Sequence, residues 1–308
     1  MSFNILSDGN ASWAFPFFDT FVQRAFPLVH IVHDPHEPPN LVIKSHWQNE
    51  RTYTCPYICV SGESYLVKHK SDQEPFLEIN TIFSNRPNSV YVPYLVFEHT
   101  TIQRPGHIRN QIPKQYCCAY VNSNRVPIRE QLFQSLRRLE PTCYAFGKSL
   151  RTDDNPFQLP DGMDERASNN TAFHEFGMYV AMENTSVRGY ITEKIGFAYN
   201  SGTVPVYWGD TETVNRFFNP DSFLNVKSYP SVESATQSIV EIWRDPHKYR
   251  TYIDAPITTH TELLEYQLWK THYTTWQKPI LEALYEEFPD VATGPSCFDT
   301  TCSTEEHS

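Results

Sequence analysis

Short apolar runs separated by turn-forming residues organise the first hundred residues of the chain. Aliphatic and aromatic residues cluster in five runs between Gly, Pro, Asn and Ser, and each run predicts a strand: 3–7, 28–33, 41–46, 57–61 and 89–97. Between the first two, "PFFDTFVQRAF" (16–26) spaces its apolar residues at helical intervals and predicts a helix. This alternation is typical of an α/β unit built on short strands.

A second series of the same kind follows a polar segment. Residues 101–115, "TIQRPGHIRNQIPKQ", contain two prolines and a glycine, which predicts a linker. Beyond it the pattern predicts strands at 117–122, 177–184, 203–208 and 223–226, and helices at 127–140, from Tyr190 onward, at 210–218 and at 231–244. Residues 261–287 have a mostly helical pattern, with a kink or break at Pro279.

The helix expected over 127–140 has a predicted start and a predicted apolar face. Pro127 suits a first helical turn, and Asn122 or Ser123 upstream are candidates for its N-cap. Its apolar stripe consists of Ile128, Leu132, Phe133, Leu136 and Leu139.

Two α/β halves, each with helices on a parallel sheet, are the simplest organisation for this pattern. We expect an N-terminal domain over 1–112, a C-terminal domain over 113–260, a helical segment over 261–288 and a disordered tail over 289–308.

Net charge narrows the range of partners. The 308 residues include 25 Lys and Arg against 36 Asp and Glu, which gives a net charge of −11 and a pI near 5.5. An acidic chain is a poor match for nucleic acid or an anionic membrane surface, although a local basic pocket for a phosphate remains possible. No apolar run approaches the roughly 18 residues of a membrane span.

Location and redox state follow from the N-terminus and the cysteines. "MSFNILSDGNASWAFPFF" lacks the charged and apolar regions of a signal peptide, so we expect a cytoplasmic protein or a soluble part of a longer one. Seven cysteines, two of them adjacent, favour reduced thiols, while Cys297 and Cys302 could pair under oxidising conditions.

Two basic residues stand where a helix dipole disfavours them. Arg129 and Lys194 each fall in the first turn of a predicted helix, and a bound anion shared by both helices would remove that conflict. A diphosphate is the natural candidate. The alternative is that both side chains point into water, at a cost of a few tenths of a kcal/mol.

Polar neighbours extend this candidate site. Glu193 could accept hydrogen bonds from sugar hydroxyls or simply stabilise the helix start, and Tyr190 offers a ring and a hydroxyl to the same place. Glu183 and Asn184 follow a predicted strand, at the end where open α/β sheets bind ligands. Each of these four residues could equally be structural.

The same region resembles a known family. "FGMYVAMEN", "YITEKIGFAYNSGTVPVYWG" and "FFNPDSFLNV" occur in the order found in the family 10 α-1,3/1,4-fucosyltransferases, and "NSNRVPIREQLFQSL" is similar to a phosphate-binding segment of bacterial members. The similarity extends from about Leu41 to Tyr252 and is strongest between Phe176 and Val226.

This resemblance implies a GT-B fold, with two Rossmann-like domains facing a cleft, and an inverting transfer of L-fucose from GDP-fucose to a sugar hydroxyl. It implies that Arg129 and Lys194 hold the diphosphate and that Tyr190 and Glu193 contact nucleotide and fucose, Glu193 being a further candidate for the catalysis itself. Glu183 and Asn184 would line the donor site.

The resemblance also implies a catalytic base in the N-terminal domain. An inverting transfer needs one group to take the proton of the attacking hydroxyl, and the matching position is Glu63 in "YICVSGESYL". Glu98 in "YLVFEH" is the competing candidate, because the pattern also places it at a strand end.

Some features depart from the family or point elsewhere. The glycine-rich turn common after the first unit of the donor domain is here "CYAFGKSLRT", so contacts of Gly147 and Lys148 with phosphate are doubtful. His30, His33, Asp34 and His36 lie close in sequence, but a strand and a turn would keep them from converging on a metal. We therefore expect no metal site and no required cofactor, and leave a stimulatory divalent cation open.

The function expected from the sequence is fucosyl transfer from GDP-fucose to a GlcNAc-containing glycan, in an α-1,3 or α-1,4 linkage, with N-acetyllactosamine as a first acceptor to test. Two alternatives stay open: a GT-B transferase for another nucleotide sugar, and a catalytically silent glycan-binding relative.

Overall fold

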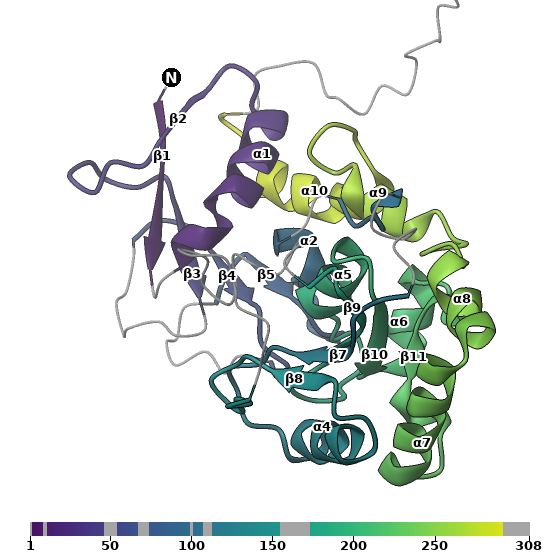
Figure 1. The fold of residues 1–308 in the computed structure, drawn as a ribbon. Helices are drawn as coiled ribbons and strands as arrows, with labels where there is room; N and C mark the ends of the chain where they lie inside the picture. Colours follow the sequence, from purple (N-terminus) through teal and green to yellow (C-terminus); the bar gives the residue numbers. More distant parts are fainter. Residues whose placement is uncertain are drawn as a thin grey trace, which may run out of the picture. The chain divides into compact units, whose positions relative to one another are not determined.

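Two parallel sheets underlie the computed structural model, which describes residues 2–8, 11–45, 54–66, 74–98, 101–106, 113–154 and 173–291 (Figure 1). They belong to two compact units. Unit 1 comprises the described parts of 1–80, 84–92 and 270–308, and unit 2 comprises those of 81–83 and 93–269. The α/β architecture expected from the sequence is confirmed.

The sheet of unit 1 has the order β2-β1-β3-β4-β5-β6, with every pair parallel. Its strands are β1 (Ser2–Asp8), β2 (His30–Val32), β3 (Leu41–Ser45), β4 (Tyr57–Ser61), β5 (Leu77–Asn80) and β6 (Ser89–Tyr91). Helix α1 (Phe15–Ala25), preceded by the 3-10 turn η1 (Ala11–Ala14), buries its apolar face and lies beside α10 (Lys278–Glu287).

The C-terminal segment therefore divides between the units. Helix α10 packs with α1, and the Phe288 ring, just after it, meets Phe3 edge-on with ring centroids 5.2 Å apart. Helix α9 (Glu262–Gln267) instead contacts α6 (Thr211–Phe217) in unit 2. The separate segment expected over 261–288 is thus shared between the two units, with η5 (Thr275–Gln277) leading into α10 and Pro279 in the first turn of that helix.

The sheet of unit 2 has the order β11-β10-β9-β7-β8, again all parallel. Its strands are β7 (Tyr116–Tyr120), β8 (Cys143–Ala145), β9 (Phe176–Met182), β10 (Val204–Trp208) and β11 (Leu224–Asn225). Their residues are almost all buried, as parallel strands covered on both faces require.

The helices of unit 2 cover both faces of this sheet. Helices α4 (Pro127–Leu139) and α7 (Val232–Arg244) pack against each other on one face, and α5 (Glu193–Asn200) packs on β9 and β10 from the other (Figure 1). The chain leaves β7 through α4 toward β8, whereas it leaves β9 through α5 toward β10. The strand order therefore reverses between β7 and β9, which is where open α/β sheets form their ligand crevice.

Several expected elements differ in detail. The strand expected over 89–97 ends at Tyr91 and is followed by α2 (Leu95–Glu98), because Pro93 has no N–H to continue a ladder. Strand β5 was not predicted, because its sequence includes Glu78, and glutamate is uncommon in a buried strand. An ion pair with Arg86 at 2.8 Å compensates the buried charge of Glu78. Helix α8 (Pro246–Asp254) was also missed.

Helix boundaries show similar shifts. The residue before α4 is the extended Val126, without a capping side chain, so neither Asn122 nor Ser123 is the cap. Of the expected stripe, Leu132, Phe133 and Leu136 are buried, while Leu139 is 44% exposed.

The expected linker is anchored where the structure describes it. Arg104 donates to the carbonyl oxygens of Tyr252, Ile253, Ala255 and Ser222 at 2.6–3.3 Å. The division between the units therefore falls near residue 93 rather than at 112, because residues 101–106 are bonded to unit 2.

The described cysteines are free thiols, in agreement with the expected reduced state: Cys55, Cys59, Cys117, Cys118 and Cys143. Burial raises the pKa of Cys59 to about 12, which keeps that thiol protonated. Cys297 and Cys302 lie outside the described residues.

Candidate functional site

The start of α4 places a buried cation at the reversal point of the unit 2 sheet. Pro127 opens the helix and Arg129 follows in its first turn. The Arg129 side chain is fully buried, with Nη2 2.9 Å from Asn184 Oδ1 and Nη1 3.4 Å from the Asn124 carbonyl oxygen. Because Asn184 follows β9, this bond crosses the reversal point between β7 and β9.

The partners of Arg129 are unusual for a buried charge. Among the described residues no carboxylate lies within ion-pair distance of its guanidinium, and its Nε has no hydrogen-bond partner. Burial lowers the pKa of Arg129, and Tyr120 and then Glu183 oppose that shift only in part. A buried cation with neutral partners is expensive to maintain, so an anion at this position would stabilise it.

The start of α5 is built around a second buried charge. Glu183 is fully buried and accepts two hydrogen bonds from Thr192, 2.8 Å from the backbone N and 2.7 Å from Oγ1. Thr192 is the N-cap residue of α5 by its backbone angles, yet its hydroxyl is used on Glu183 and does not cap the helix. Burial raises the pKa of Glu183, whereas the Lys194 ammonium lowers it.

Lys194 completes this cluster. Its Nζ donates to Thr192 Oγ1 at 3.0 Å and lies 3.6 Å from Glu183 Oε2 and 3.5 Å from Glu193 Oε1. The Lys194 and Glu193 side chains keep 17% and 21% of their surface exposed, so both can still reach a ligand. The consecutive residues Glu183 and Asn184 thus connect Lys194 at one helix start with Arg129 at the other.

Tyr190 precedes α5 in a turn fixed by Gly189. The helix begins at Glu193, three residues later than expected, because Gly189 has φ +91° and turns the chain first. The Gly189 N–H donates to Asp210 Oδ2 and Thr213 Oγ1, each at 3.1 Å. A Cβ at Gly189 would lie 2.8 Å from the backbone nitrogen of Phe83, so this position requires glycine. Tyr190 is 4% exposed.

Sequence reasoning missed several residues of this cluster. Asp210 holds Gly189 and also caps α6, a role that "DTET" could have indicated. Lys227 donates to Ser186 Oγ at 2.8 Å and brings a further cation to the loop after β9, without a local signal. Asn122, after β7, is buried, and its Nδ2 has no hydrogen-bond partner among the described residues.

Comparisons with known proteins identify the family. The model of "glycosyltransferase family 10 (fucosyltransferase) C-term" matches residues 111–286, which is more than half of the chain. The chain belongs to glycosyltransferase family 10. The resemblance noted from the motifs is confirmed, and the matched residues include all six donor-site candidates: Arg129, Glu183, Asn184, Tyr190, Glu193 and Lys194.

Family 10 relatives in other organisms agree with this match. The chain is 33% identical over 170 residues to "Alpha-(1,3)-fucosyltransferase FucT" of Helicobacter pylori, which covers 49% of this chain and 33% of that protein. It is 30% identical over 145 residues to "Alpha-(1,4)-fucosyltransferase" of Arabidopsis thaliana, covering 43% of this chain and 36% of that protein. The matches thus span about a third of the length of these two relatives.

The fold of this family 10 chain also matches solved structures. A crystal structure of an α1,3-fucosyltransferase with GDP-fucose superposes with a TM-score of 0.61 at 18% identity, covering 96% of this chain and 91% of the other. The GT-B type of fold expected from the motifs is confirmed by this likeness.

The candidate base of this family 10 chain lies in the other unit. Glu63 follows β4 of unit 1, half-buried, and its backbone N–H donates to Ser61 Oγ at 3.3 Å. Burial is the larger cause that raises the pKa of the Tyr65 hydroxyl, and the negative charge of Glu63 adds to this shift. Glu98, the competing candidate, is the last residue of α2 rather than a strand end, so the reason for considering it does not hold.

Two sequence features have structural explanations in this family 10 chain. A Cβ on Gly147 would lie 2.1 Å from the Asn122 carbonyl oxygen, so the glycine allows two loops to pack closely. His33 bonds Ile5 O and Asp19 rather than sharing a centre with His30 and His36, and the described residues contain no cluster of three metal-ligating side chains. Within the described ranges, no helix has the length and apolar character needed to cross a lipid bilayer.

Proposed function

We propose that this family 10 chain transfers L-fucose from GDP-fucose to a hydroxyl of a GlcNAc-containing glycan, with inversion, to form an α-1,3 or α-1,4 linkage. One observation carries the proposal: the fully buried Arg129 guanidinium, at the reversal point of a parallel sheet, has neutral oxygens as its described hydrogen-bond partners. A nucleotide diphosphate supplies the missing negative charge.

The donor contacts follow from the positions of the side chains. Arg129 and Lys194 hold the diphosphate from the two helix starts, and Glu193 and Tyr190 contact the fucose and the nucleotide. Asn184 currently occupies one N–H of Arg129. A phosphate oxygen replaces that neutral acceptor once the Asn184 side chain turns aside, while Glu183 keeps Thr192 and Lys194 in place.

The chemical step needs a base for the acceptor hydroxyl and positive charge for the leaving group. The acceptor hydroxyl oxygen attacks C1 of fucose, the bond from C1 to the phosphate oxygen breaks, and GDP leaves with the bonding electrons. The Glu63 carboxylate takes the hydroxyl proton. Arg129 and Lys194 stabilise the charge that develops on GDP. We propose that these two cations take the place of a required metal ion, so turnover is expected to persist after chelation with EDTA.

Calorimetric titration with GDP, GDP-fucose, GDP-mannose and UDP tests the donor assignment. GDP and GDP-fucose are expected to bind, and UDP is not. Selective binding of another nucleotide would overturn fucose as the transferred sugar. Binding of none of them would favour a catalytically silent relative.

A substitution in unit 1 then separates binding from chemistry. Glu63→Gln is expected to leave the Kd of GDP-fucose unchanged while kcat with N-acetyllactosamine falls at least ~100-fold, the usual effect of removing a general base. Glu74→Gln, in the same unit, is the matched control. Near-normal turnover of Glu63→Gln would assign the proton transfer to another group.

A further inference from the structure

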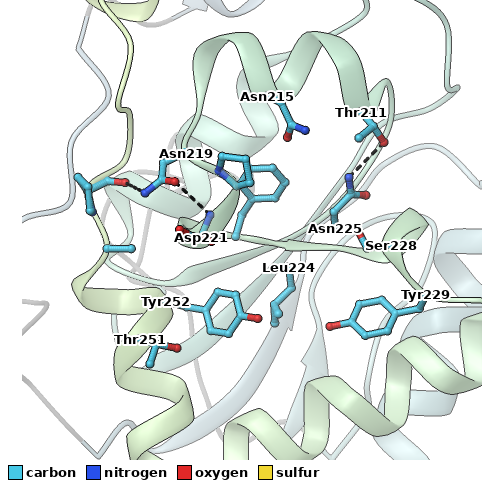
Figure 2. Close-up of a pocket in the computed structure, with 14 residues that line it drawn as sticks. Thr211, Asn215, Asn219, Asp221, Leu224, Asn225, Ser228, Tyr229, Thr251 and Tyr252 are labelled. Atoms are coloured by element: carbon cyan, nitrogen blue, oxygen red, sulfur yellow. Dashed lines mark hydrogen bonds between the residues drawn. The ribbon is translucent and has the colours of Figure 1, made fainter.

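A polar pocket lies in unit 2 beside the edge strand β11. Its volume is about 500 Å³, within the range of roughly 300–1,000 Å³ typical of small-molecule sites. Residues from α6, from the segment around β11 and from the end of α8 line it (Figure 2). None of the candidate donor residues is among them.

Carboxamide side chains form the upper part of this pocket in Figure 2, and two of them are already fixed. Asn225 Nδ2 donates to Thr211 Oγ1 at 3.1 Å, and Asn219 Nδ2 donates to the Pro256 carbonyl oxygen at 3.0 Å. Asn215 differs, because its Oδ1 is buried and has no hydrogen-bond partner among the described residues. A buried acceptor of this kind indicates a missing donor.

Two tyrosines form the opposite part. Figure 2 shows the rings of Tyr229 and Tyr252 on either side of Leu224, with their hydroxyls pointing toward each other. Burial raises the pKa of both hydroxyls, so they remain neutral near pH 7 and can both donate and accept. Each ring also offers an apolar face beside a polar tip.

The charge of the lining selects among ligand classes. Asp221 is the one charged residue among the described side chains that line the pocket. Anions such as phosphates or nucleotides are therefore disfavoured, since no cation is in place to receive them. Amides, hydroxyls and aromatic faces together match a neutral molecule with many hydroxyl groups and apolar C–H faces.

We propose that this pocket binds a neutral saccharide at a site separate from the donor site. The Asn215 side chain turns toward the pocket, so that its Oδ1, covered by protein without the ligand, accepts a hydrogen bond from one sugar hydroxyl. The rings of Tyr229 and Tyr252 pack against the C–H faces of the sugar. This inference does not depend on GDP-fucose as the donor.

Selective ¹⁵N labelling of asparagine gives a readout located in the pocket. The side-chain amide signal of Asn215, assigned by its loss in Asn215→Ala, is expected to shift on titration with N-acetyllactosamine or maltose. The probe with the lower Kd then identifies the kind of saccharide that the pocket binds. Glucose 6-phosphate, compared with glucose, is expected to bind more weakly because Asp221 repels it.

Variants confirm the location. Thr251→Trp places a large ring at the exposed rim and is expected to abolish the shifts, whereas Thr271→Trp in unit 1 is the matched control and keeps them. Asn215→Ala is expected to weaken saccharide binding about 5-fold, which corresponds to the loss of one hydrogen bond. In this variant, binding is measured from the side-chain amide signal of Asn225. Unchanged thermal unfolding midpoints establish that both pocket variants are folded.

Three results would overturn the proposal: no shift of the Asn215 signal with either saccharide, shifts that persist in Thr251→Trp, or tighter binding of glucose 6-phosphate than of glucose. Because GDP binding is measured separately, failure here leaves the donor assignment of Arg129 and Lys194 untouched.

Discussion

Arg104 and Arg129 are two arginines of unit 2 whose guanidinium groups have different partners. Arg104 donates to four backbone carbonyl oxygens and lies 5.0 Å from the centroid of the Tyr199 ring. Arg129 is more deeply buried, yet its described partners are all neutral: the Asn184 amide oxygen, the distant Asn124 carbonyl oxygen and the Tyr120 hydroxyl. Arg104 is therefore compensated by the protein, whereas Arg129 is compensated only in part.

We propose that this difference separates a structural arginine from a ligand-binding one. Carbonyl oxygens and an aromatic face satisfy Arg104 without a ligand, and together they hold residues 101–106 on the end of α8. The environment of Arg129 becomes favourable only when a negative charge arrives. On this proposal, an arginine side chain adds to folding stability at position 104 and to binding free energy at position 129.

Arg129→Met provides the largest test of this contrast. The Kd of GDP-fucose is expected to rise at least ~100-fold, because a buried charge-assisted contact contributes roughly 2–5 kcal/mol. The free energy of unfolding without ligand is expected to stay equal or increase, since an unpaired buried charge is replaced by an apolar side chain. Calorimetry and urea unfolding measure the two effects.

Arg138→Met, on the exposed side of α4, is the matched control and should change neither quantity. Unchanged affinity in Arg129→Met would remove Arg129 from the donor site. A large loss of stability would show that Arg129, like Arg104, is mainly structural.

Local pattern explains which parts of the fold could be predicted. Strand β4 and helix α7 were expected nearly at their observed bounds, because their apolar spacing is regular and Ser231 caps α7. Strand β5 was missed because its buried Glu78 depends on Arg86, eight residues later. The prolines and glycine of residues 101–115 predict a linker. The bonds of Arg104 leave no local pattern, because its partners lie far along the chain.

The candidate site was likewise predictable from the sequence only in part. Arg129 and Lys194 were visible because a cation in the first turn of a helix conflicts with the dipole. The two hydrogen bonds from Thr192 to Glu183 and the lack of a described carboxylate partner for Arg129 depend on which side chains meet in space. No spacing rule in the sequence encodes either of them.

Arg104→Met tests the other side of the comparison. Four carbonyl oxygens lose their donor, so the free energy of unfolding is expected to fall by about 2 kcal/mol. Urea unfolding measures this loss, with Arg138→Met again as the control. The Kd of GDP-fucose should change little, and a large rise in that Kd would mean that the position of residues 101–106 supports the donor site.

Asn184→Asp gives Arg129 a negatively charged partner within the protein, so that its charge is compensated without a ligand. The new carboxylate replaces an amide oxygen that lies 2.9 Å from Nη2 and gives the guanidinium an internal anion. GDP-fucose is then expected to bind about 10-fold more weakly, a loss of about 1.4 kcal/mol, because the phosphate must compete with it. Calorimetry tests this effect, and Asn184→Ala, which adds no charge, should weaken binding less. Equal or tighter binding by Asn184→Asp would contradict the idea that Arg129 lacks an anion.

Lys114 extends the comparison to a third buried cation and has the smallest expected effect. Its Nζ donates to the His174 carbonyl oxygen at 2.8 Å, and burial lowers its pKa from 10.5 to about 8. Between these two values the unfolded chain binds the proton more strongly, so this group makes the protein more stable as pH rises from about 8 toward 10.5. Relative to Lys114→Met, the wild type is expected to gain at least about 1 kcal/mol over that interval, since a shift of one pKa unit corresponds to about 1.4 kcal/mol. Urea unfolding of both chains at several pH values measures the difference, and a stability difference that does not depend on pH would show that the charge of Lys114 is compensated as fully as that of Arg104.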